Sequence, residues 1–117
     1  MTILQRILAL PKGKKVPPDY TIKGSGKSRG DAAIVYFVPS RTGTSNSQKR
    51  VRESEWELAY QELSKTGQFT RRWFETNIPD AAKDGTCSFR FIGEVFVLLG
   101  LAIRVDGSQG SRYILVS

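Results

Sequence analysis

The sequence predicts an α+β fold, in which a small N-terminal antiparallel β-hairpin or sheet precedes three helices and a C-terminal β-hairpin. Three patterns predict it. Residues 33–38 are mostly β-branched and aromatic and end at a proline, as in a buried strand. Residues 88–99 carry apolar side chains at spacings of three, four and three, as on one buried helix face. From residue 102 the apolar period falls to two on both sides of a glycine-containing turn, which is typical of a hairpin.

The first fifty residues contain the predicted β-structure. Residues 2–10 form a short helix or an extended arm, which Pro11 ends. Residues 20–23 and 33–38 are expected to pair as a hairpin, with residues 49–52 as a third strand. We expect a single domain over residues 1–117, with a basic arm and hairpin in residues 1–52 and a helical unit in residues 53–117.

Two helices are predicted before the long apolar one. Ser54 is a favourable N-cap, and acidic residues in the first turn suit the helix dipole, so a helix is expected from residue 54 to residue 65. Thr70 is expected to cap a second, short helix over residues 71–77, which Pro79 ends. Residues 80–87 are expected to form a loop.

Helix, helix, helix and hairpin in this order resemble a winged helix-turn-helix domain over residues 53–117, about half of the chain. In such proteins the third helix enters the major groove and the hairpin, or wing, touches the backbone or the minor groove. The resemblance implies contacts from two places. The third helix would offer Ser88, Arg90 and Glu94, and the wing would offer Arg104, Ser108, Gln109 and Arg112.

The third helix is apolar on nearly all sides, because Phe91, Val95, Val97 and Leu98 add to its core stripe. A helix of this kind is usually buried. It is therefore expected either to read the groove, or to serve as a central scaffold, or to pack on a second subunit.

Charge is distributed unevenly along the chain. The net charge is +7, but residues 1–52 hold 11 lysines and arginines against two aspartates, whereas residues 53–117 hold seven against nine acids. Such asymmetry favours a polyanionic partner, most often nucleic acid. The expected phosphate contacts in the first half are Lys12, Lys14, Lys15, Lys23, Lys27, Arg29, Arg41, Lys49, Arg50 and Arg52. Arg71 and Arg72, at the start of the second helix, are expected to join them.

The sequence predicts a small regulatory or accessory protein that binds double-stranded DNA. The alternatives are a protein-interaction module that dimerises or docks through the third helix, and an RNA-binding protein in which Tyr20 and Tyr36 stack on bases. No enzyme activity, metal or cofactor is expected, because the chain has no histidine and Cys87 lacks a neighbouring base. With one cysteine and no long apolar run, a cytoplasmic protein without membrane contact is expected.

Overall fold

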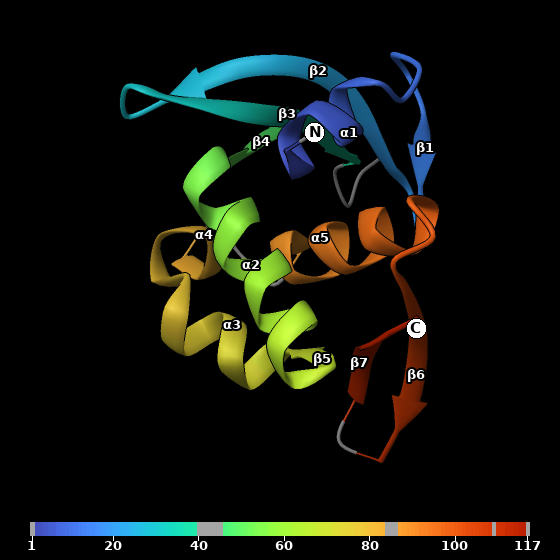
Figure 1. Ribbon diagram of the computed structural model, residues 1–117. Helices are drawn as coiled ribbons and strands as arrows, with labels where there is room; N and C mark the ends of the chain where they lie inside the picture. Colours follow the sequence, from blue (N-terminus) through green and yellow to red (C-terminus); the bar gives the residue numbers. More distant parts are fainter. Residues whose placement is uncertain (1, 40–45, 84–86, 109, 117) are drawn as a thin grey trace.

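The computed structural model describes residues 2–39, 46–83, 87–108 and 110–116, and these residues form two antiparallel sheets and five helices (Figure 1). In chain order the elements are α1 (Ile3–Leu8), β1 (Lys15–Val16), β2 (Tyr20–Ser28), β3 (Asp31–Pro39), β4 (Asn46–Arg52), α2 (Glu53–Thr66), β5 (Gln68–Thr70), α3 (Arg71–Asn77), α4 (Pro79–Lys83), α5 (Cys87–Leu98), β6 (Ala102–Gly107) and β7 (Gly110–Leu115).

The larger sheet is a four-stranded antiparallel meander in the order β1-β2-β3-β4, and it curls over the helices (Figure 1). A register shift between Ile22 and Gly24 marks a bulge in β2, and bulges increase local twist and bending. Ile34 and Tyr36 of β3 belong to the buried core, and Tyr36 stacks on Phe91 of α5 with ring centroids 3.7 Å apart. The inner face of this sheet therefore packs on α5.

The smaller sheet has the order β5-β7-β6, so that β7 is its central strand. Phe69 and Tyr113 lie opposite each other in neighbouring strands and are both fully buried. Their rings contact Phe89 of α5, with centroids 5.0 and 5.6 Å away. α5 consequently packs against both sheets.

The position of α5 explains its composition. Residues 88–96 of this helix are buried except Arg90, because the large sheet, the small sheet and α2 surround it. Gly93 stands where α5 passes closest to β7, and a β-carbon there would overlap the Tyr113 ring. The absence of a side chain at this one position lets the helix approach the sheet.

The winged-helix-like architecture predicted from the sequence is wrong. The structure is α+β, but a curled four-stranded sheet dominates it, and the described chain has five helices and seven strands instead of a three-helix unit with a C-terminal wing. The C-terminal hairpin forms, yet it is part of a three-stranded sheet with a buried Tyr113 at its centre. The apolar helix that the sequence predicts as the third one is α5, and most of its surface packs in the core of the same chain.

Several element bounds also differ from the predicted ones. The helix expected from Ser54 begins at Glu53, and its N-cap is Arg52, whose backbone amide donates to the Glu55 carboxylate at 2.8 Å. Strands β1 and β5 were not predicted, because two or three residues are too few to show an apolar period. Helix α4 occupies part of the expected loop over residues 80–87, of which residues 84–86 lie outside the described residues.

Candidate nucleic-acid interface

The outer face of the large sheet is the side turned away from α5. Partners in an antiparallel ladder share a face, and successive residues alternate between faces. Because Tyr36 points into the core, Phe37 points outward, and its ladder partners Thr21 and Gln48 lie on the same side. Lys15 is paired with Thr21 and donates to the Thr21 hydroxyl at 2.9 Å. A continuous row of outward side chains thus crosses all four strands.

A second row lies beside the first. Val35 is paired with Gly24 on one side and Arg50 on the other, and the side chain of Lys12 approaches Gly24 from the edge of the sheet. Val35 is only 3% exposed although it lies outside the main core cluster. The row is therefore a small apolar strip bordered by two cations.

Four cations lie in these two rows or beside them. The Lys23 ammonium lies 5.8 Å from the centroid of the half-buried Phe37 ring, a cation–π contact. We name the following exposed residues the cationic sheet face: Lys12, Lys15, Lys23 and Arg50. None of these four forms an ion pair with an acid in the described part of the chain, so their charge is available to an anionic partner.

Three other predicted contacts lie on the same sheet or beside it but are not part of the cationic sheet face. Lys14 is exposed in the segment before β1, where its carbonyl accepts from the Ile22 amide. Lys27 is exposed near the β2–β3 turn. Lys49 is half-buried and is the ladder partner of Tyr36, so it lies on the inner side of the sheet.

Arg29 and Arg52 are predicted contacts that pair with acids instead. Both guanidinium groups reach the Asp80 carboxylate of α4, at 2.8 and 3.0 Å, and Arg52 also lies 3.4 Å from Glu55. Burial lowers the pKa of Arg52, but the hydrogen bond and charge of Glu55, followed by Asp80 and Asp31, outweigh burial and raise it. The two arginines fasten the large sheet to the helices.

The residues expected to read the major groove from the third helix are mostly inside the protein. Ser88 and Glu94 are 1% and 5% exposed, and Glu94 accepts from the Tyr113 hydroxyl at 2.8 Å and from Arg104 at 3.3 Å. Arg90 lies 3.7 Å from the same carboxylate. Ser88 and Glu94 of α5 are therefore inside the protein, whereas Arg90 of α5 and Arg104 of β6 are partly exposed and pair with Glu94. Burial raises the pKa of Tyr113, and Glu94 raises it further.

A second cationic site lies where α3 begins beside the β6–β7 turn. This groove is lined by Arg71, Arg72, Arg112 and the turn residue Ser108, among others. Its acid, Asp106, accepts from the Ser111 hydroxyl at 2.6 Å and lies 3.5 Å from Arg104. α3 and the β6–β7 hairpin, which line the groove, lie at the opposite end of the molecule from the large sheet (Figure 1).

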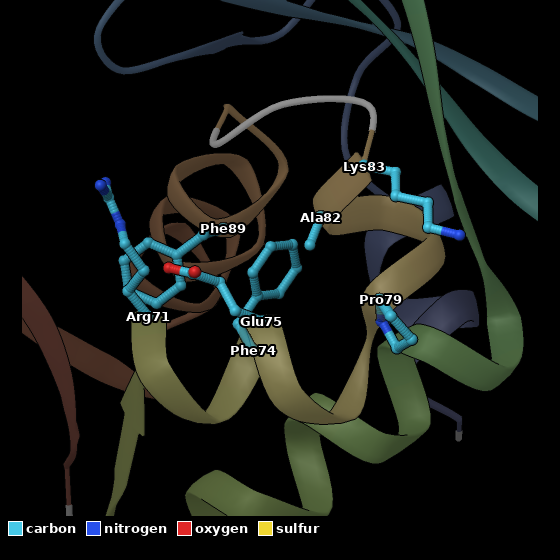
Figure 2. Close-up of a pocket in the computed structure, with 7 residues that line it drawn as sticks. All are labelled: Arg71, Phe74, Glu75, Pro79, Ala82, Lys83 and Phe89. Atoms are coloured by element: carbon cyan, nitrogen blue, oxygen red, sulfur yellow. The ribbon is translucent and has the colours of Figure 1, made fainter.

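Arg71 is shared between this groove and an apolar cavity. The cavity, of about 290 Å³, is formed by α3, α4 and the start of α5, and Phe74, Phe89, Glu75 and Arg71 are among its lining residues (Figure 2). The Arg71 guanidinium lies 5.5 Å from the centroid of Phe89. Arg72 and Arg112 are thus the groove cations without such a contact.

The aromatic residues expected to stack on bases are buried, at 8% exposure for Tyr20 and 0% for Tyr36. The aromatic residue on the outer face of this sheet is the half-buried Phe37, which lies in the strand that the sequence predicts to be buried. Successive side chains of a strand point to opposite faces of the sheet, so this alternation was the sequence signal that could place Phe37 and Tyr36 on different faces. Two further predicted contacts, Arg41 and Gln109, lie outside the described residues.

Comparison with known proteins finds no matching family, no similar curated protein and no similar solved structure. The arrangement alone defines an α+β protein with a cationic, partly aromatic sheet face. Among the described residues, no helix is long and apolar enough to cross a membrane.

Proposed function

We propose that this protein binds DNA by contacting its phosphate backbone from the cationic sheet face, with the groove between α3 and the β6–β7 turn as a second contact. The observation that carries the proposal is the open sheet face itself. Lys15 and Arg50 belong to adjoining ladder rows, Lys23 lies over Phe37 and the Lys12 side chain lies near Gly24. None of the four has an acidic partner within the described chain. Lysine and arginine side chains on such a face meet phosphates without base-specific geometry.

The proposal rests on more than the net positive charge, because several other cations of this chain are already paired with acids. Arg29, Arg52, Arg90 and Arg104 all pair with carboxylates. Among the described residues, the cations of the sheet face and of the groove form no ion pair, so they remain for a partner. The alternative of protein docking through α5 requires an exposed apolar helix, whereas most of α5 is buried in its own chain. A cytoplasmic location remains part of the proposal.

Paired charge reversals test the proposal. The double variant Lys23→Glu, Arg50→Glu removes two phosphate contacts from the sheet face, and Arg72→Glu, Arg112→Glu does so in the groove. We expect the sheet variant to weaken binding to a labelled duplex by at least about tenfold and to make the dependence of log K on log salt shallower by about 2. The groove variant is expected to have a smaller effect.

The matched control is Lys65→Glu, Lys83→Glu, which changes the net charge equally at exposed lysines of α2 and α4 that belong neither to the cationic sheet face nor to the groove. It should retain nearly all of the affinity. If all three double variants lose the same affinity, net charge alone explains binding and the sheet face has no special role. If the unmodified protein does not bind DNA, the proposed function is wrong.

A further inference from the structure

The outer face of the large sheet contains a hollow of about 530 Å³ at the end where β1 meets β2. Thr21 and Phe37, which are direct ladder partners, form part of its lining. Prolines stand on both sides of this pair, Pro17 and Pro18 between β1 and β2, and Pro39 at the end of β3. Rings therefore form part of the lining: the flat aromatic ring of Phe37 and the rigid, apolar rings of the three prolines.

Lys15, Asp19 and Thr21 supply the polar side chains of the hollow. The Lys15 ammonium donates to the Thr21 hydroxyl at 2.9 Å, so the two side chains hold each other at the edge of the hollow. Asp19, at the β1–β2 turn, adds a carboxylate acceptor. Prolines have no backbone N–H, so the ring-lined sides provide contact area while the edge provides donors and an acceptor. A flat ligand with apolar faces and a hydrogen-bonding rim matches this arrangement.

The cations around the hollow determine which flat ligand fits it. Lys23 lies over Phe37, and Arg50 and Lys12 occupy the adjoining row. A ligand seated beside Phe37 therefore continues into a region that attracts phosphates. A nucleobase attached to a sugar-phosphate chain has both properties, whereas an uncharged apolar ligand would leave the surrounding cations unused.

We propose that this hollow binds an unpaired nucleobase, stacked beside Phe37, while the neighbouring lysines and Arg50 hold the flanking phosphates. This inference rests on the proposed function and specifies its substrate as single-stranded nucleic acid. In a duplex the faces of each base are covered by its neighbours, so a base must leave the stack before it enters the hollow. Stacking of one base on an aromatic side chain strengthens binding by roughly 5- to 150-fold, with little dependence on base identity.

The test compares three labelled probes of equal length: a single-stranded oligothymidylate, an abasic strand with the same phosphates, and a duplex. The full chain should bind the oligothymidylate at least about fivefold more tightly than the other two. Phe37→Leu, which keeps an apolar side chain but removes the ring, should abolish this preference and leave the affinity for the abasic strand unchanged. Lys23→Glu, Arg50→Glu should weaken binding of all three probes.

A second variant guards against misfolding. Phe37→Trp keeps an aromatic face, so it should retain the preference for the oligothymidylate, and its added fluorescence should be quenched when a base stacks. The inference is overturned if all three probes bind equally to the unmodified protein, or if Phe37→Leu keeps the preference. In either case binding itself persists and the proposed function stands. If none of the probes binds, both proposals fail together.

Discussion

The substitution Gly93→Ala tests the packing of α5 against the small sheet. A β-carbon at this position would overlap the ring of Tyr113. The ring cannot easily move away, because Tyr113 is fully buried and its hydroxyl donates to Glu94 at 2.8 Å. The added methyl group therefore must separate the helix from β7 or displace the tyrosine.

The expected cost follows from three contributions. Overpacking a tight core costs about 1–3 kcal/mol, and we take the upper end because an aromatic ring must shift. Weakening the buried hydrogen bond between Tyr113 and Glu94 adds about 1–2 kcal/mol. Alanine gains about 1 kcal/mol over glycine inside a helix. The free energy of unfolding should fall by about 3–4 kcal/mol, which lowers Tm by roughly 10 °C or more.

Urea unfolding followed by circular dichroism measures this change directly. The control is Gly107→Ala, because a β-carbon there meets its nearest atom, the Gly110 carbonyl oxygen, at an ordinary 3.8 Å. The control should change stability by less than about 1 kcal/mol. A Gly93→Ala protein as stable as the parent, or more stable, would refute the close approach of α5 to β7.

Two further predictions concern stability. Burial raises the pKa of Tyr36 and Tyr113, so these phenols stay protonated in the folded state, whereas tyrosines of the unfolded chain ionise near pH 10. Above pH 10 the unfolded state therefore binds fewer protons than the folded state. The free energy of unfolding then falls by about 1.4 kcal/mol per pH unit for each of the two tyrosines. Urea melts at rising pH should show a smaller fall for Tyr113→Phe, and equal slopes would contradict the burial argument. Arg52→Ala should destabilise the fold by about 1–2 kcal/mol, because it leaves the buried Glu55 without its cation and Asp80 with Arg29 alone. The exposed Arg72→Ala should change stability by less than about 0.5 kcal/mol, and comparable losses in both would disprove a structural role for Arg52.

The sequence was most informative where an apolar period ran for several turns or strand residues. The helix ending near Gly67, the strand over residues 33–38 and the C-terminal hairpin all appear close to the predicted positions. Their local patterns agree with their tertiary surroundings, since Leu63 and Tyr113 are buried as their spacing indicates. The α+β class follows from these elements alone.

The arrangement of the elements was harder to predict. β5 has only three residues, and its pairing with β7 joins segments more than forty positions apart, so no local pattern reveals it. Without β5 the C-terminal hairpin resembles an independent wing. The four-stranded sheet likewise depends on β1, two residues long, and on a β4 that begins before its apolar residue.

For the candidate site too, the sequence predicted properties of single residues but not the contacts between residues far apart in the chain. Charge counting located the unpaired lysines of the first half correctly as exposed residues. It did not distinguish them from Arg29 and Arg52, whose partner Asp80 lies 51 and 28 positions later in the chain. Nor did it separate Phe37 from Tyr36, because both are aromatic residues of one strand and only the identity of the covered face distinguishes them.

The most direct test of the central claim is a titration of the isotope-labelled full chain with an oligonucleotide, followed by amide chemical shifts. The account predicts that the largest shifts occur along the cationic sheet face, at Lys15, Lys23, Phe37 and Arg50, and that they shrink as salt increases. The buried residues of α5 should move least. Shifts that are absent, or that concentrate away from the large sheet, would contradict the account.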